Sequence, residues 1–135
     1  MNQHVIETLE QCTCAADDAS LRFPEIVAKL MEAGVEQYHA DLLRAEKTYY
    51  LPDGVTHISK CAPVATLFAT AFDAAGIAAA VRASQAQEID YTAFCERVAA
   101  AGCTGYFVSM AGRRALYLGR TAESCVEYFP STPRQ

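Results

Sequence analysis

The sequence predicts an α+β domain in which helices pack on an antiparallel sheet, built as a tandem duplication of an α-α-β-β-β unit. One observation is the stretch at 89–108, IDYTAFCERVAAAGCTGYFV, which has the pattern of a capped helix, a glycine stop and an aromatic strand. Another is the stretch at 23–42, FPEIVAKLMEAGVEQYHADL, which repeats this pattern at a constant offset in numbering (91 − 23 = 68). A single unit could not cover its own apolar face, so we expect the two copies to share one core about a pseudo-twofold axis.

The offset holds without a gap from the helix into the hairpin that follows it. It pairs Phe23 with Tyr91, Ile26 with Phe94, Val27 with Cys95, Leu30 with Val98, Ala33 with Ala101, Gly34 with Gly102, Glu36 with Thr104, Tyr38 with Tyr106, Tyr49 with Tyr117 and Ile58 with Val126. The period is too long, and the copies are too few, for a solenoid. We therefore expect a single domain over residues 1–135, with internal repeats at about 1–60 and 69–129.

The first copy is expected to start with two helices. Apolar residues at helical spacing predict an amphipathic helix from about 5 to 16, which ends at Asp17-Asp18. Pro24 suits the first turn of the second helix, and Gly34 ends that helix in a left-handed conformation. Strands are then expected at 36–42, 47–51 and 55–59, with a turn at Pro52-Asp53-Gly54 between the last two.

The connection at 61–72 has two interpretations. Its apolar residues fit helical spacing, whereas Pro63, Thr66 and Thr70 suit an edge strand. We expect an extended strand here.

The second copy is expected to repeat the same elements. Asp73 and Asp90 can cap helices that occupy 74–87 and begin at about Tyr91. Gly102, like the glycine of the first copy, is expected to have a positive φ where its helix ends. Strands are expected at about 104–110, 114–118 and 123–129, with a hairpin through Ala111-Gly112 and a frayed tail from Pro130.

Length and composition indicate an ordinary globular protein. The chain has 135 residues, of which 52% are hydrophobic and 20% charged. Its net charge of −5 and its scattered basic residues lack the attraction that drives nucleic-acid binding, so we expect no nucleic-acid partner. No apolar run approaches the roughly 20 residues of a membrane span, and the N-terminus lacks the features of a secretory signal. We therefore expect a cytoplasmic protein that does not bind a membrane.

The six cysteines are expected to be reduced thiols. Cys95 stands where the first copy has Val27, so we expect it to act as a small apolar packing group. The residues with soft ligands of the kind that Zn²⁺ takes are Cys12, Cys14, His57 and Cys61. The first two would point about 200° apart on a helix, and neither close pair has a usual zinc spacing. We expect no metal, cofactor or disulfide.

The second helix and strand of the second copy contain a family motif. Within the run Q-x-x-x-IDYTAFCERVAAAG at 85–102, the motif combines Asp90-Tyr91, Phe94-Cys95 and Ala101-Gly102, followed by Tyr106 on a strand and Tyr117 in a hairpin. From about Phe23 to Pro130 the chain resembles the YbcV/YdfO-like family of small bacterial and prophage-encoded proteins, some of which are labelled phage envelope protein. The resemblance implies a phage or prophage origin and attaches no mechanism to it.

Most of the seven tyrosines fall on predicted strands. Tyrosine favours strands by propensity, so packing within the core and sheet is one explanation. The other is a groove for a ligand or peptide, for which the candidate binding residues are Tyr38, His39, Tyr106 and Tyr117. His39 faces the opposite side of its strand from Tyr38 and is expected at the surface. The sequence contains no phosphate loop, nucleophile elbow or paired carboxylates, so we assign no catalytic residues.

Two functions from different classes remain. The first is a non-catalytic binding or interaction module of phage or prophage origin, which would bind a protein partner through a sheet face or form a homodimer. The alternative is a small ligand-binding protein or enzyme with a pocket at the junction of the two repeats. A concave pocket with converging polar groups at that junction would distinguish the second function from the first.

Overall fold

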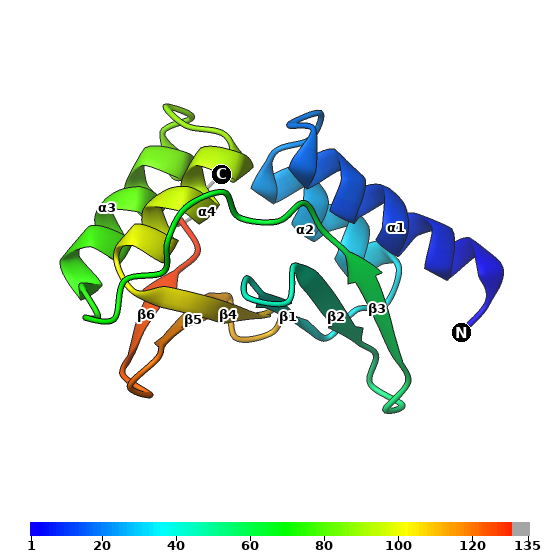
Figure 1. Ribbon diagram of the computed structural model, residues 1–135. Coiled ribbons are helices and arrows are strands. Elements are labelled where there is room, and N and C mark those ends of the chain that lie inside the picture. The colour runs from blue at the N-terminus through cyan, green and yellow to red at the C-terminus, as the bar shows by residue number, and fades with distance from the viewer. Residues whose placement is uncertain (131–135) are drawn as a thin grey trace.

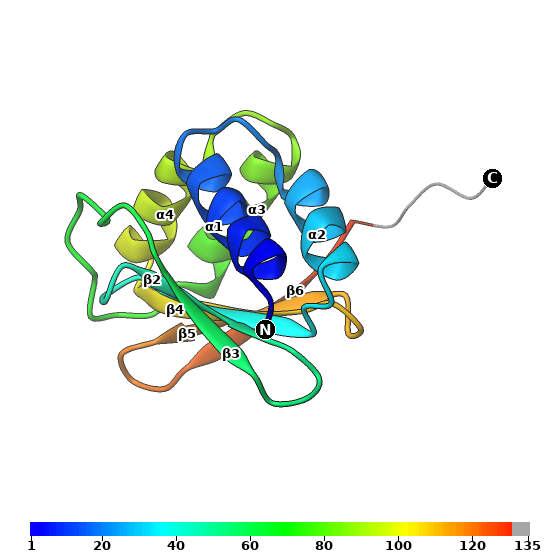
Figure 2. The ribbon, with the colours of Figure 1, turned by 90° about the vertical axis from the view of Figure 1, so that its right-hand side faces the viewer.

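Four helices cover one face of a six-stranded antiparallel sheet in the computed structural model, which describes residues 1–130 (Figures 1 and 2). The elements in chain order are α1 (Gln3–Asp17), α2 (Phe23–Glu32), β1 (Gln37–Asp41), β2 (Glu46–Tyr50), β3 (Thr56–Lys60), α3 (Ala74–Gln85), α4 (Tyr91–Ala100), β4 (Cys103–Ser109), β5 (Arg114–Gly119) and β6 (Ser124–Tyr128). The order α-α-β-β-β therefore occurs twice, and the predicted α+β class is confirmed.

The first strands of the two units meet at the centre of the sheet. The strand order is β3-β2-β1-β4-β5-β6, and each neighbouring pair is antiparallel. In the β1–β4 ladder His39 pairs with Phe107, which is its own equivalent in the second unit (107 − 39 = 68). The ladder is therefore symmetric about this pair, and one unit extends from it to each edge of the sheet.

Side-chain caps hold the helix starts that the sequence predicted in the second unit. Asp73 Oδ1 accepts a hydrogen bond from the Gly76 N–H at 3.0 Å, where α3 begins. Asp90 Oδ1 accepts one from the Ala93 N–H at 2.9 Å, where α4 begins. Each carboxylate satisfies an N–H that has no partner inside its helix. The two predicted caps are therefore confirmed.

Glycine ends the second helix of each unit in the same backbone conformation. Gly34 and Gly102 both have φ of 91°, a left-handed value that other residues adopt only with strain. This conformation turns the chain from α2 into β1 and from α4 into β4. The prediction of positive φ at both glycines is confirmed.

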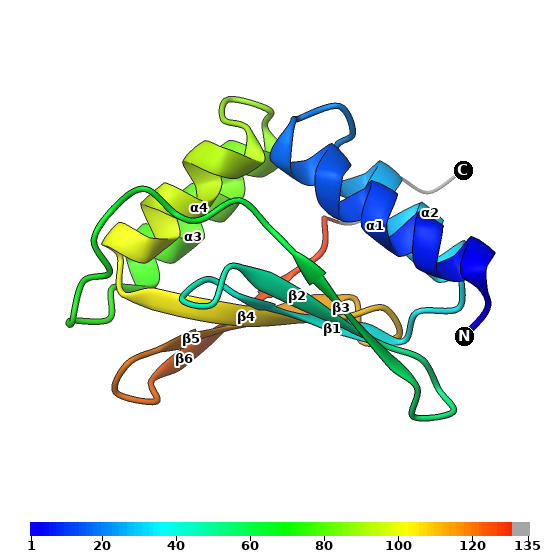
Figure 3. The ribbon, with the colours of Figure 1, turned by 45° about the vertical axis from the view of Figure 1, so that its right-hand side comes forward.

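The expectation of an extended strand at 61–72 is wrong, because neither a strand nor a helix forms there. This segment crosses from β3, at one sheet edge, to α3 in the helix layer, and it runs beside α4 on the way (Figures 1 and 3). The Ala69 N–H donates to the Ala99 carbonyl at 3.0 Å, and the Asp73 N–H donates to the Ala101 carbonyl at 2.8 Å. These bonds to the end of a helix replace the ladder that an edge strand would have made.

The core lies between the helices and the sheet and draws on equivalent positions of both units. Leu9, Leu30, Ile77 and Val98 are fully buried. Leu9 matches Ile77 (77 − 9 = 68), and Leu30 matches Val98 (98 − 30 = 68). The opposite face of the sheet has no helix over it in the described part of the chain (Figures 2 and 3).

Candidate functional site

A cavity of about 480 Å³ lies between the two units, over the helix-covered face of the sheet. The strand residues that line it are Tyr38, Lys47, Tyr106, Val108, Ala115, Tyr117, Glu127 and Tyr128. Side chains alternate between the two faces along a strand, so the residues two apart in β4 and β5 point the same way into the cavity. Its position at the junction of the units matches the pocket that the second functional hypothesis required.

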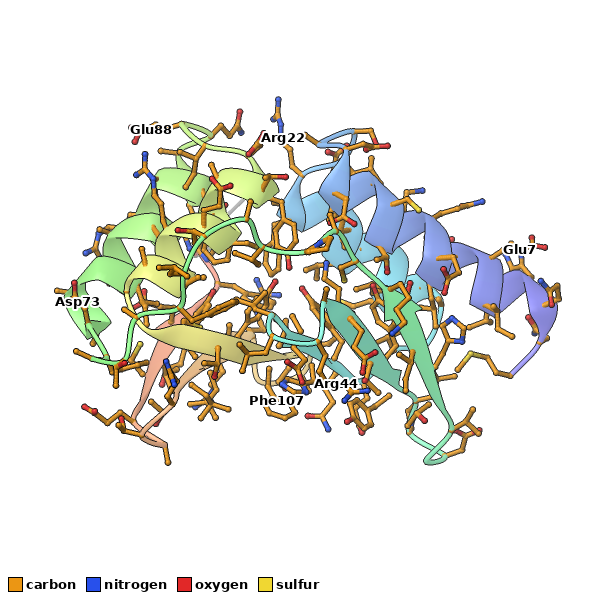
Figure 4. All side chains as sticks on the ribbon, viewed as in Figure 1. Glu7, Arg22, Arg44, Asp73, Glu88 and Phe107 are labelled. Atoms are coloured by element: carbon orange, nitrogen blue, oxygen red, sulfur yellow. The ribbon has the colours of Figure 1, made fainter. Side chains whose placement is uncertain are left out.

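The helix layer forms the remaining walls of the cavity. The N-terminal turns of α2 and α4 contribute Phe23, Ile26, Tyr91 and Phe94. The exposed lining residues Arg22 and Glu88 belong to the loops that join each pair of helices, so the cavity opens towards these loops (Figure 4). Phe129 closes part of the wall, with its ring centroid 5.3 Å from that of Phe23.

A cluster of tyrosines occupies the centre of the site. The ring centroids of Tyr38 and Tyr106 lie 6.4 Å apart, and those of Tyr106 and Tyr117 lie 5.2 Å apart. The Tyr91 and Tyr106 hydroxyls share a hydrogen bond of 2.7 Å. Burial raises the pKa of each of these four phenols above its ordinary value of 10. The hydroxyls are therefore protonated at neutral pH and able to donate.

Tyr117 differs from its equivalent, Tyr49, in what its hydroxyl contacts. The Tyr49 hydroxyl shares a buried hydrogen bond of 2.7 Å with Thr13 Oγ1 on α1. The position equivalent to Thr13 is Val81 (81 − 13 = 68), which cannot form such a bond. Within residues 1–130 the Tyr117 hydroxyl has no hydrogen-bond partner, and the residue lines the cavity. A bound molecule could supply the missing acceptor.

Lys47 brings an amine into this aromatic site. Lys47 is only 4% exposed, and its Nζ atom forms no hydrogen bond or ion pair within residues 1–130. The Nζ atom lies over two rings, 4.3 Å from the centroid of Tyr91 and 5.9 Å from that of Tyr38. Burial lowers the pKa of the Lys47 amine, because the charged form loses its water shell. Cation–π contacts offset part of that loss.

The site is asymmetric although the units around it are alike. The position equivalent to Lys47 is Ala115 (115 − 47 = 68), whose small side chain leaves open space. On the other side of the sheet centre, the counterpart of the cavity has a volume of about 10 Å³ and is lined by Cys61, Ala62 and Cys95, among others. One amine therefore faces one large cavity, and the second unit does not repeat this arrangement.

Three of the four predicted binding residues lie together in the cavity, namely Tyr38, Tyr106 and Tyr117. His39 lies on the opposite, helix-free face, where its ring stacks on that of Phe107 at 4.3 Å with an interplanar angle of 10°. Figure 4 labels Phe107 on that face. Sequence reasoning missed Lys47. Its signal was the alternation in β2, which places Lys47 on the same face as the buried Tyr49.

The four weak metal candidates do not converge. Cys12 is buried whereas Cys14 is exposed. His57 Nε2 lies 2.6 Å from Glu10 Oε2 and is thereby engaged. Within the part of the chain that the structure describes, no group of three or more histidine, cysteine or acidic side chains is arranged to hold a metal ion.

Cys95 packs in the core beside the tyrosine cluster. It is buried, and burial raises the pKa of its thiol to about 12, which makes a thiolate scarce at neutral pH. Its equivalent, Val27, is buried too. Both positions therefore hold a small apolar side chain on the inner face of a helix.

Cys95→Val is expected to cost less than about 1.5 kcal/mol, because the swap nearly conserves volume and removes no ionised group. Urea unfolding of the variant, with and without chelator and reductant, measures this cost. Cys14→Ser at an exposed position of α1 is the matched control and should leave the midpoint unchanged. A larger loss in Cys95→Val, or rapid labelling of Cys95 by a thiol reagent in the folded protein, would contradict the packing role.

The fold and the site together define a small α+β protein with an aromatic cavity and a buried lysine between two α-α-β-β-β units. The chain belongs to the family described as "Protein of unknown function (DUF1398)", whose sequence profile matches residues 11–126. That match extends from α1 into β6. A comparison with curated proteins finds no match. Within residues 1–130, every helix is too short or too polar to cross a bilayer.

Proposed function

We propose that the protein binds a small organic molecule in the cavity between its two units. The molecule has a flat apolar body and one oxygen acceptor, either a carbonyl or a carboxylate. The volume of about 480 Å³ supports this, because ligand pockets commonly measure about 300–1,000 Å³. The lining supports it too, since a mostly apolar wall with a few converging polar groups is typical of such sites.

The observation that carries this proposal is the buried Lys47 amine without an acidic partner in residues 1–130. A buried amine that lacks a partner costs free energy, whether it keeps its charge or loses it. Folded proteins retain such groups mainly where function requires them. An acceptor oxygen from a ligand would compensate the Lys47 amine and could also accept a hydrogen bond from the Tyr117 hydroxyl.

The charges around the cavity restrict the ligand further. Asp90 and Glu127 both line it, so a ligand with several negative charges would meet carboxylates as well as the amine. Donors and rings converge in the interior, where Tyr38, Tyr106 and Phe94 can contact a flat body by their faces and edges. These features favour a singly charged or neutral aromatic molecule over a nucleotide or a polyphosphate.

Isothermal titration calorimetry of the protein with 2-naphthoate tests the proposal. We expect saturable binding of one molecule per chain. Lys47→Met should weaken it by roughly 10- to 100-fold, because a hydrogen bond to a charged group is worth about 1.5–3 kcal/mol. Tyr117→Phe should weaken it by roughly fivefold, since it removes one neutral hydrogen bond of about 1 kcal/mol.

Lys60→Met is the matched control for the titration. Lys60 Nζ lies 3.0 Å from Glu46 Oε2, its side chain is 79% exposed, and it is absent from the cavity wall. The control should bind 2-naphthoate as tightly as the natural chain. Equal binding by Lys47→Met and the natural chain would place the ligand elsewhere and defeat the proposal.

An interaction module is the second candidate, and the helix-free face of the sheet favours it. Ile58 and Val126, which are equivalent positions, are 55% and 40% exposed on that face. An apolar surface of this kind is typical of a protein contact. Light scattering measures whether the protein forms a dimer and whether Ile58→Lys disrupts it. A dimer that this substitution disrupts, together with a failure of 2-naphthoate to bind, would support the interaction module over the ligand-binding function.

We further propose that the two units arose by duplication and that the protein has a prophage origin. The repeated element order and the constant offset support descent of both units from one ancestral unit. Tolerance of Cys95→Val, which gives the second unit the residue of the first, would add to that support. The likeness to the YbcV/YdfO-like proteins supports a prophage origin. Phage genes beside the coding sequence would add support to this origin, and neighbouring genes without any relation to phages would weaken it.

A further inference from the structure

The three lysines of the chain lie in different chemical settings. Lys60 forms an ion pair with Glu46, and Lys29 lies on the exposed face of α2. Lys47 instead lines the cavity, 4% exposed, with its Nζ 4.3 Å from the ring centroid of Tyr91 and without an acidic partner in residues 1–130. An amine without an ion-pair partner can act as a nucleophile when it is neutral.

We propose that Lys47 captures carbonyl compounds covalently, its amine condensing with an aldehyde or ketone group of the bound molecule to form an imine. This inference rests on the proposed function, because it requires that the cavity bind a small organic molecule. It narrows the acceptor oxygen of that molecule to a carbonyl. It also adds a covalent step to what would otherwise be reversible binding by contacts alone.

The reaction balances without an oxidant or a reductant. The Lys47 nitrogen attacks the carbonyl carbon, a C–N bond forms as the C=O π bond breaks, and a proton passes from nitrogen to oxygen. The resulting carbinolamine loses its hydroxyl group together with a proton as water, while the nitrogen lone pair forms the C=N bond. One carbonyl compound and one amine therefore give one imine and one water.

Groups that face the amine set its readiness to react. Burial lowers the pKa of Lys47 and so increases the neutral fraction near pH 7. The thiols of Cys61 and Cys95, Asp17 on α1 and the thiol of Cys12 oppose this, because a negative charge on any of them would favour the ammonium form. Burial dominates, and it also keeps these thiols mostly neutral, since it raises their pKa values.

The tyrosines can donate hydrogen bonds to the oxygen that the reaction removes. Tyr91 lies beneath the amine, and its hydroxyl shares a hydrogen bond of 2.7 Å with that of Tyr106. Burial holds the pKa of both phenols well above 10, so both hydroxyls stay protonated at neutral pH. A hydrogen bond from such a hydroxyl can stabilise the carbinolamine oxygen.

The experiment is reductive trapping with 2-naphthaldehyde, the carbonyl counterpart of the 2-naphthoate probe. The full chain is incubated with the aldehyde and sodium cyanoborohydride at pH 7, and peptides are mapped by mass spectrometry. Among the three lysines we expect one adduct, at Lys47, with a mass gain of the aldehyde minus one oxygen. Labelling of Lys47 should be at least roughly tenfold faster than that of Lys29 or Lys60, because only Lys47 lines the cavity that would hold the aldehyde beside the amine.

Lys29 and Lys60 are internal controls, so the result does not depend on a variant that folds. Lys60→Met should label at Lys47 as fast as the natural chain does. Labelling of Lys29 or Lys60 at the same rate as Lys47, or no adduct at Lys47, overturns the inference. If 2-naphthoate binds while Lys47 stays unlabelled, the covalent step fails and the binding function stands; if neither probe binds, both fail.

Discussion

Gly102→Ala is expected to destabilise the protein by about 3 kcal/mol. The residue has φ of 91°, which an alanine adopts only with strain of about 1 kcal/mol. A Cβ at this position would also collide with the Ala71 carbonyl oxygen and would lie 3.0 Å from the Phe72 Cα, both in the segment 61–72 that crosses from β3 to α3. That backbone must move, and overpacking of this kind costs about 1–3 kcal/mol more.

Gly34→Ala provides the matched control for this prediction. Gly34 has the same φ of 91°, but a Cβ there would meet no heavy atom within 4 Å. It should cost only about 1 kcal/mol, which is the backbone strain alone. Urea unfolding of both variants measures the difference, and equal losses would show that the crossing segment does not rest on the end of α4.

Lys47→Met is expected to stabilise the folded protein by about 1–2 kcal/mol near neutral pH. Methionine has nearly the length of the lysine stem and needs no partner in an apolar site. The substitution removes the cost of burying most of a lysine side chain without an acidic partner for its amine. The same variant should lose 2-naphthoate binding. A gain in stability together with a loss of binding is typical of a residue retained for function.

The pH dependence of this gain follows from the direction of the pKa shift. Burial places the pKa of Lys47 in the folded protein below its ordinary value of 10.5, so the folded state binds fewer protons than the unfolded state between the two values. The free energy of unfolding that Lys47 contributes therefore increases as pH rises through this interval. The advantage of Lys47→Met should be largest below the interval and should shrink towards pH 10.5.

Thermal unfolding from pH 6 to 9 measures this trend, with Lys60→Met as the control. Lys60 is exposed, and its partner Glu46 keeps a second cation, Arg44 at 2.8 Å, so the replacement of Lys60 should change stability by less than about 0.5 kcal/mol. If Lys47→Met is less stable than the natural chain at neutral pH, the amine has a stabilising partner in solution. The argument for a ligand would then lose its main support.

Local signals predicted the parts of the fold that depend on neighbours in sequence. Asp73 and Asp90 act on N–H groups three residues away, and Gly102 changes the direction of the chain by its own backbone. The crossing segment was predicted wrongly because its conformation depends on carbonyls of α4 about 30 residues further along the chain, which no local pattern reveals. Apolar spacing there indicated burial, and Phe68 and Phe72 do pack on the core.

The site was predictable where strand alternation and the constant offset between the units agreed. They placed Tyr38 and Tyr106 on the inner face of the central strands, and both line the cavity. Lys47 was missed because lysine is rarely buried, so its place on a buried face was not considered. The units differ at a position that lines the cavity, with Ala115 in the second unit and Lys47 in the first, and the volume of the cavity depends on packing that a sequence does not state.

The symmetric ladder at the sheet centre has a consequence for folding kinetics. Within the described chain β1–β4 is the only strand pairing between the units, and it joins residues as distant as Gln37 and Ser109, which are 109 − 37 = 72 positions apart. The three strands of each unit can pair through local contacts, whereas the β1–β4 ladder must close a long loop. We therefore expect the two units to dock late in folding. The cavity exists only after docking. A molecule bound in it should therefore slow unfolding and leave the folding rate unchanged.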